Sequence, residues 1–349
     1  MKNMIKQCVG IDISQKEIDV TFGIYGLDQS IEFLESRKFK NREKSFAVFL
    51  KWVLKWAEKD IPLFFVMEAT GVYHEKLACF LYDKQQKVSV VLPNRASSYA
   101  KSLEVKTVTD KEASKSLTRM GLEKKMDLWE KPNPIYNTLK QLTREREQLQ
   151  KSKTMCKNQL HAETKSAWPN KESVKRVRKR IKFLEIQITE IEKEIHDFIE
   201  ANPELKRKIQ FMTSITGIGV LTAATVAGET NGFLLMKHKR QLVSYCGYDV
   251  IRKDSGTSVH SKPRISKKGN RHIRKAMHFP ALTAIKYNDR DKNQFIRMVQ
   301  KHGIKMKAAV AIQRKLLVLM YTLWKKEEFF DPNFMEQSLK NEIGQLTLP

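Results

Sequence analysis

Three acidic residues, Asp12, Glu68 and Asp110, stand where an apolar or basic stretch gives way to a turn. The chain around them has 65 lysines and arginines against 39 acids, which gives a net charge of +26. A chain this basic binds polyanions such as DNA or RNA, with an affinity that falls as salt rises. Carboxylates kept within such a chain suit a divalent metal ion held against a phosphate. The pattern therefore indicates phosphodiester chemistry on nucleic acid.

Each acid taken alone has an ordinary structural explanation. Asp12, in residues 9–14, could be a solvated strand end, and Asp110, in residues 106–113, could be an N-cap or a favourable charge at a helix start. Glu68 directly follows the apolar stretch 63–67. In this order the three favour a shared site, where Mg²⁺ would take carboxylate oxygens and keep water for its other ligands.

Two further motifs suit phosphate binding. Gly217 and Gly219 follow the hydrophobic-x-Gly-hydrophobic-Gly pattern of helix-hairpin-helix modules, whose backbone N–H groups face a phosphate. A glycine turn that packs two helices is the competing interpretation. The second motif is a basic run that can neutralise phosphates or can form a merely solvated face. Its basic residues are Arg264, Lys267, Lys268, Arg271, Arg274 and Lys275.

The elements that must position these residues begin with short strands at residues 7–14 and 17–23 and around Phe39, in the manner of an antiparallel meander. A helical pattern through residues 46–57, the very apolar strand 63–67, a helix over 73–85 and a strand over 88–92 follow. This order predicts a mixed sheet covered on both faces. The RNase H-like fold has that order.

Beyond residue 129 the composition changes to dense charge with apolar residues at three- and four-residue spacing. This pattern predicts two long helices broken at residues 168–170, either a coiled coil that forms a dimer or two arms that pack only on each other. A mostly helical part follows, with a glycine-containing polar insertion at 249–269. We therefore expect three domains: 1–128 α/β, 129–203 a helical coiled-coil connector, and 204–349 mainly α.

Composition also indicates in which cellular compartment the protein is expected. No apolar run approaches the roughly 20 residues needed to span a bilayer, and the first residues show no signal-type apolar stretch. The four cysteines, Cys8, Cys79, Cys156 and Cys246, form no CxxC pair, so neither a zinc knuckle nor a disulfide framework is supported. We expect a soluble, cytoplasmic protein with no membrane partner.

The motifs carry a resemblance to a known family. Residues 10–14 (GIDIS), 68–71 (EATG) and 106–121, with the basic run from 264, resemble the bacterial insertion-sequence transposases of the "one-ten" family. Their amino-terminal DEDD domain is similar in fold to Holliday-junction resolvases. The resemblance implies that Asp12, Glu68 and Asp110 bind Mg²⁺, and that the carboxy-terminal domain supplies a nucleophilic serine, here Ser255. It also implies a composite active site and a structured guide RNA that pairs with donor and target DNA.

The serine assignment rests on the resemblance. A serine hydroxyl is a weak nucleophile unless a base or metal removes its proton, so a serine beside a metal cluster makes chemical sense. From the residues alone, Ser255 followed by Gly256 is an ordinary turn. Ser258 and Ser261 are near enough for an error of register.

One position departs from the family pattern. The third acid is expected to be followed three residues later by an aspartate, which would share its helix face, and this chain has Ala113 there. Either three acids suffice, or Glu112, Asp127 or a group from another domain completes the set, or this copy is impaired.

The resulting hypothesis is a transposase or serine recombinase of an insertion sequence that cuts and rejoins DNA. It would work with Mg²⁺ and Ser255 on donor and target DNA, with a structured guide RNA, as a homo-oligomeric dimer or tetramer. The alternatives are a junction-type nuclease that uses water and a noncatalytic nucleic-acid-binding protein.

Overall fold

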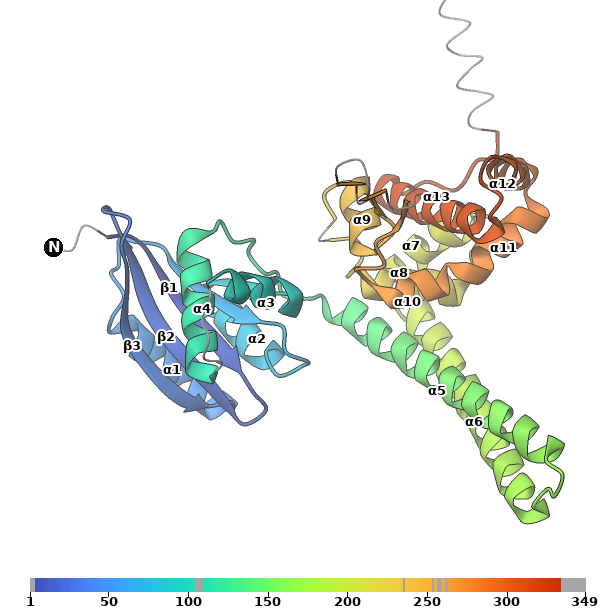
Figure 1. Ribbon diagram of the computed structural model, residues 1–349, viewed down its shortest axis with the longest axis horizontal. Helices are drawn as coiled ribbons and strands as arrows, with labels where there is room; N and C mark the ends of the chain where they lie inside the picture. Colours follow the sequence, from blue (N-terminus) through green and yellow to red (C-terminus); the bar gives the residue numbers. More distant parts are fainter. Residues whose placement is uncertain are drawn as a thin grey trace, which may run out of the picture. The chain divides into compact units, whose positions relative to one another are not determined.

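The computed structural model describes residues 4–103, 109–234, 236–252, 254–255, 259–260 and 263–333. The chain divides into two compact units, Met1–Lys131 and Pro132–Pro349 (Figure 1). The boundary lies close to the predicted one after residue 128. The ranges predicted as connector and third domain share the second unit.

The first unit contains a five-stranded sheet in the order β3-β2-β1-β4-β5. The first three strands form an antiparallel meander, and the last two run parallel to β1. The predicted mixed sheet is therefore confirmed. Its strands are β1 (Met4–Ile13), β2 (Glu17–Gly26), β3 (Ile31–Lys40), β4 (Leu63–Glu68) and β5 (Lys87–Val91).

Alternation along β1 separates the two faces of this sheet. Val9 and Ile11 belong to a buried cluster with Phe49 of α1, whereas Cys8 belongs to another with Leu117 of α4. Successive side chains of a strand point to opposite faces, so α4 covers the face that the even-numbered residues of β1 share. The helices of this unit are α1 (Glu43–Leu54), α2 (Glu75–Asp83), α3 (Pro93–Ser102) and α4 (Asp110–Glu123).

The second unit begins with two long helices, α5 (Pro134–Lys165) and α6 (Lys171–Glu200), that lie side by side as a hairpin (Figure 1). Asn170 caps α6, since its side-chain oxygen accepts from the backbone N–H groups of Glu172 and Ser173. The apolar stripe of α6 is buried at spacings of three and four residues, which is the seam of two packed helices. Its members are Val177, Ile181, Leu184, Ile188, Ile191, Ile195 and Ile199.

The rest of the second unit is mainly helical around the buried face of the last helix. In the described ranges, four two-residue strands interrupt it: β6 pairs with β9, and β7 pairs with β8. None of the helices in the described ranges is long and apolar enough to cross a membrane. The elements are α7 (Pro203–Thr213), α8 (Val220–Glu229), α9 (Lys239–Tyr245), β6 (Val250–Ile251), β7 (Asp254–Ser255), β8 (Val259–His260), β9 (Arg264–Ile265), α10 (Arg271–Ala276), α11 (His278–Tyr287), α12 (Asp289–His302) and α13 (Lys305–Lys326).

Candidate active site and nucleic-acid interface

Two of the three acids end neighbouring strands at one edge of the sheet. The parallel register of β1 and β4 pairs Ile11 with Met67, and the next residues are Asp12 and Glu68. Because partners in register share a face, both acids belong to the face that α4 covers. Separate stretches of the sequence thus bring two carboxylates to the same place.

The third acid reaches this place because α4 packs directly on the backbone of β1. A Cβ atom on Gly10 would lie 2.2 Å from the carbonyl oxygen of Ser114 and 2.2 Å from the backbone nitrogen of Thr118. The N–H of Gly10 donates to Oγ1 of Thr118 at 3.0 Å, and this hydroxyl in turn contacts the carbonyls of Ser114 and Thr21. Only glycine permits so close an approach.

The direction of α4 follows from a second contact of the same kind. A Cβ on Gly121 would lie 2.3 Å from Sγ of Cys8 and 2.8 Å from Val66. The helix therefore runs opposite to β1, from Gly121 over Cys8 back to its first residue, Asp110, at the end of the strand that carries Asp12. This geometry places the three acids at one edge of the sheet.

The electrostatics of Asp12 agree with this placement. Burial, and after it the negative charges of Asp110, Glu68 and Asp19 in that order, together raise the pKa of Asp12 to about 6. A neighbouring like charge disfavours ionisation only when it lies close, so these carboxylates form one negatively charged cluster. Thr70 donates its hydroxyl hydrogen to Glu68 at 3.4 Å and steadies that side chain.

The donor set of the cluster suits a hard divalent cation, because every ligand it offers is a carboxylate oxygen. Within the described residues, no three acidic, histidine or cysteine side chains are already arranged as metal ligands. Closure around a cation would therefore require rotation of the carboxylate side chains. Asp12, Glu68 and Asp110 would hold the ion, which would neutralise their mutual repulsion and polarise a bound phosphate.

The structure also bears on the missing fourth acid. Ala113 lies one turn after Asp110 in α4. Glu112 instead pairs with Lys115 at 2.8 Å, and Asp127 is 97% exposed and 3.9 Å from a guanidinium nitrogen of Arg95. Neither side chain is engaged with the cluster, so neither takes the role of the absent aspartate in this arrangement.

Asp19 is an acid beside the cluster that the sequence analysis missed. It lies directly opposite Asp12 in the antiparallel pair of β1 and β2 and shares its face. Its carboxylate is 3.2 Å from Nζ of Lys38. The pairing register of β1 and β2 places Asp19 opposite Asp12, and this register can be read only once the position of the turn between the two strands is known.

The N-cap interpretation of Asp110 is wrong. Thr109 is the N-cap of α4, and its hydroxyl oxygen accepts from the backbone N–H of Glu112 at 3.2 Å. Asp110 is the first helical residue, where a negative charge is favoured by the helix dipole. Its carboxylate is therefore not used to cap the helix backbone.

Ser255 lies in the second unit, in the β7–β8 pair, where it is opposite Val259. Only its backbone is described, and Ser258 and Ser261 lie outside the described residues. The β6–β9 pair, with Ile251 opposite Arg264, brackets the segment that contains all three serines. A short ladder therefore holds both ends of this segment together.

The predicted phosphate-binding residues divide into two groups. Arg264, Lys267, Lys268 and Arg271 are exposed. Arg274 instead turns back on the fold, where its guanidinium donates to the carbonyls of Cys246 at 2.7 Å and Gly269 at 3.1 Å.

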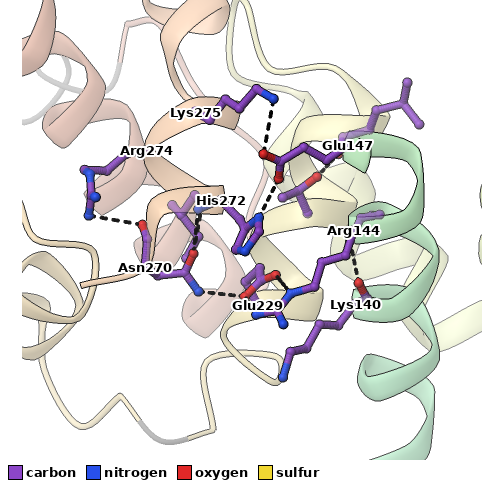
Figure 2. Close-up of polar contacts among 12 residues, drawn as sticks. Lys140, Arg144, Glu147, Glu229, Asn270, His272, Arg274 and Lys275 are labelled. Carbon is purple, nitrogen blue, oxygen red and sulfur yellow. Dashed lines mark hydrogen bonds and ion pairs between the residues drawn. The ribbon is translucent and has the colours of Figure 1, made fainter. Parts of the chain in front are cut away.

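Lys275 lies on α10 beside Arg274, and its ammonium is 3.1 Å from Glu147 of α5 (Figure 2). The guanidinium of Arg274 and the ammonium of Lys275 are thus already engaged within the fold.

A buried ionic network fixes this basic helix, and the sequence analysis missed it (Figure 2). The side chain of Glu229 is fully buried and accepts two hydrogen bonds from Arg144, at 2.6 and 2.9 Å. Asn270 donates to the same carboxylate at 2.6 Å and caps α10 with its other side-chain atom. Burial opposes the ionisation of Glu229, but these hydrogen bonds keep its pKa below the usual value. The network joins α5, α8 and α10.

The two glycines of the helix-hairpin-helix-like motif lie in different environments. Gly217 has a φ of +93°, and a Cβ on it would lie 2.7 Å from the carbonyl oxygen of Pro280. It therefore allows close packing against α11, as the competing interpretation of the motif requires. Gly219 precedes α8, and a Cβ there would meet nothing within 4 Å. The start of α8 is thus open at Gly219.

Comparisons with known proteins bear on the family of this chain. The family model described as "Transposase" of the DEDD IS110 type matches residues 9–169, and the "Transposase IS116/IS110/IS902 family" model matches residues 209–296. Among curated proteins, the pilin gene-inverting proteins of Moraxella lacunata and Moraxella bovis are 29% and 28% identical over 337 residues. Each alignment covers 95% of this chain and 100% of the relative.

Among solved structures, RuvC of T. thermophilus in complex with a Holliday junction substrate matches 32% of this chain and 90% of its own. The identity is 10% and the TM-score 0.25, which is too low to support a conclusion.

The family follows from the sequence comparisons. Two models of one family account for most of the chain, and relatives match it along nearly its whole length. The chain belongs to the IS110 family of transposases and is an enzyme that acts on DNA.

Proposed function

We propose that this protein is a serine recombinase of an insertion sequence that cuts and rejoins DNA with the help of Mg²⁺. The observation that carries the proposal is the convergence of Asp12, Glu68 and Asp110 at one sheet edge. The meander followed by two parallel strands supports an RNase H-like fold for the first unit, as in enzymes that cut phosphodiesters. The Moraxella relatives are named for inverting a gene segment, and an inversion requires both cutting and rejoining.

The chemistry divides between the two units. Asp12, Glu68 and Asp110 would hold the cation, which supplies charge neutralisation at a phosphate. Oγ of Ser255 would attack phosphorus while the bond from phosphorus to a sugar oxygen breaks. The hydroxyl proton passes to a base, and the released sugar oxygen takes up a proton. The phosphoserine ester keeps the bond energy that the reverse attack by a sugar hydroxyl needs for rejoining.

The partners follow from the same proposal. DNA is the substrate, and the resemblance of the motifs implies a structured guide RNA. A net charge of +26 is favourable for binding a second polyanion. RNA sequencing of the nucleic acid that survives a high-salt wash tests this part, with the native flanking DNA supplied during expression. The protein is further proposed to form a dimer or tetramer, and the sedimentation coefficient of the protein, free and on nucleic acid, tests that. A cytoplasmic location would give access to both nucleic acids.

Replacement of Ser255 tests the nucleophile. Ser255→Ala should abolish both strand transfer and the covalent protein–DNA adduct, while Ser258→Ala and Ser261→Ala should retain them. A junction-type nuclease would still cut DNA after Ser255→Ala, because its nucleophile is water. A noncatalytic binding protein would show no cleavage by the unchanged chain under any metal condition and binding that is independent of Mg²⁺.

A further inference from the structure

A groove of about 840 Å³ lies in the second unit beside the ladder that holds the serine segment. Val250 of β6 and Ile265 of β9 line one side, and residues of α12 and α13 line the other. Val250 and Ile265 are also opposite each other in the β6–β9 pair. The groove and the ends of the segment with Ser255 are therefore built on the same residues.

The floor of the groove is apolar. Along α13, Val310, Ala311 and Val318 face it at the spacing of one helix face, and Met298 of α12 lies across from them. Val310 and Val318 are half-buried, so part of their apolar surface is in contact with water in the free protein. A ligand with flat apolar faces would remove that surface from water.

The rim of the groove is cationic. Lys307 and Arg314 stand on the same face of α13 as the apolar residues, and Arg264 and Lys267 come from the opposite side. Lys315 also lines the groove, but its ammonium is 2.6 Å from Asp291. Among the described residues that line the groove there is no aspartate or glutamate. An apolar floor between rows of positive charge suits a ligand with apolar faces and a charged backbone.

We propose that this groove binds an unpaired stretch of the DNA strand next to the position that Ser255 attacks. Bases of an unpaired strand expose flat faces that can rest on Val310 and Val318, and their phosphates can pair with Lys307 and Arg314. Duplex DNA presents phosphates and sugars outward and keeps its base faces stacked, so it cannot cover the apolar floor. The choice of DNA rests on the proposed function, because the groove shares its ladder with the serine segment.

Binding to a fluorescein-labelled oligo(dT) of roughly 12 nucleotides tests the proposal by anisotropy, with the full chain and EDTA present to prevent cleavage. Lys307→Ala with Arg314→Ala should weaken binding about tenfold at 0.1 M salt. The slope of log K against log salt should become shallower by about 1.4, because each phosphate on a single strand contributes about 0.7. The matched control is Arg297→Ala with Lys301→Ala, which removes the same charge from exposed positions of α12 outside the groove. This control variant should keep most of the affinity for oligo(dT).

The apolar floor has its own variant. Val310→Ser should weaken oligo(dT) binding about threefold and leave the salt slope unchanged, since it removes apolar contact and no charge. Blunt duplex DNA of the same length should bind the floor variant and the unchanged chain equally. Thermal melting of each variant shows whether it folds. If Val310→Ser does not fold, the variants at the exposed positions Lys307 and Arg314 still test the proposal.

Several results would overturn this proposal. One is an equal loss of oligo(dT) affinity in the groove variants and in the control variant. Another is a groove variant that loses binding to oligo(U) but keeps its binding to oligo(dT), which would make RNA the occupant. A changed sedimentation coefficient with unchanged oligonucleotide binding would make a protein segment the occupant. Because the assay measures binding without cleavage, it separates the groove from the catalytic proposal. Loss of the covalent adduct in Ser255→Ala would stand even if the groove proved irrelevant.

Discussion

Replacement of Asp12 by asparagine should stabilise the metal-free protein and remove its response to a divalent cation. The pKa of this carboxyl is raised from 3.8 to about 6, first by burial and then by the charges of Asp110, Glu68 and Asp19. In the unfolded chain the group loses its proton near pH 4, but in the folded chain only near pH 6. The free energy of unfolding therefore falls as pH rises through this window and stays lower above it.

The size of this effect follows from the same shift. A pKa raised by about two units corresponds to roughly 3 kcal/mol at about 1.4 kcal/mol per unit. Because Asp12 is only half-buried, solvent screening reduces this to roughly 1–2 kcal/mol. Asp12→Asn should therefore raise the melting temperature of the first unit by about 3–8 °C at pH 7 in EDTA, and by much less at pH 4.

The assay is thermal melting with and without Mg²⁺ or Mn²⁺. The unchanged chain should gain stability with rising metal concentration, because a cation that binds only the folded state stabilises it. Asp12→Asn should gain little. The matched control is Asp127→Asn, which removes the same charge from a position that is 97% exposed. It should change neither value. Reduced metal-free stability in Asp12→Asn, with an undiminished metal response, would refute the reasoning.

Three further substitutions have defined outcomes. Glu229→Gln should destabilise the second unit by roughly 3 kcal/mol, because it leaves Arg144 without its charged partner, and chemical denaturation measures this; an unchanged midpoint would contradict the role of the network. Gly10→Ala should destabilise the first unit by at least about 2 kcal/mol, because its Cβ would meet α4 backbone at 2.2 Å; an unchanged melting temperature would contradict the packing. Ala113→Asp, one turn after Asp110, should tighten Mn²⁺ binding in calorimetry and lower metal-free stability, and unchanged affinity would place position 113 outside the site.

Much of the first unit could be predicted because its signals are local. Alternating apolar residues mark β1, and Glu68 directly follows an apolar strand, so two acids at neighbouring strand ends were foreseeable. Asp19 was not foreseeable, because its place opposite Asp12 depends on the register set by the turn between β1 and β2. The third strand was recognised only around Phe39, since half of the residues of Ile31–Lys40 are exposed polar ones.

The partners of the basic run could not be predicted from local sequence patterns. Its charge was visible in the sequence, but the partners of Arg274 and Lys275 were not. Arg274 binds carbonyl groups of a preceding turn, and Lys275 meets Glu147, which is more than a hundred residues earlier. Whether a lysine or arginine stays available for phosphate depends on such distant contacts, which no local pattern encodes.

We propose that a serine of the second unit attacks DNA with the help of a metal held by the first. Its most direct test is mass spectrometry of peptides from protein stopped during reaction with DNA in Mg²⁺. We expect a nucleotide attached to Ser255, present with metal and absent with EDTA or after Asp12→Asn. DNA cut in Mg²⁺ with no nucleotide on any serine would contradict it.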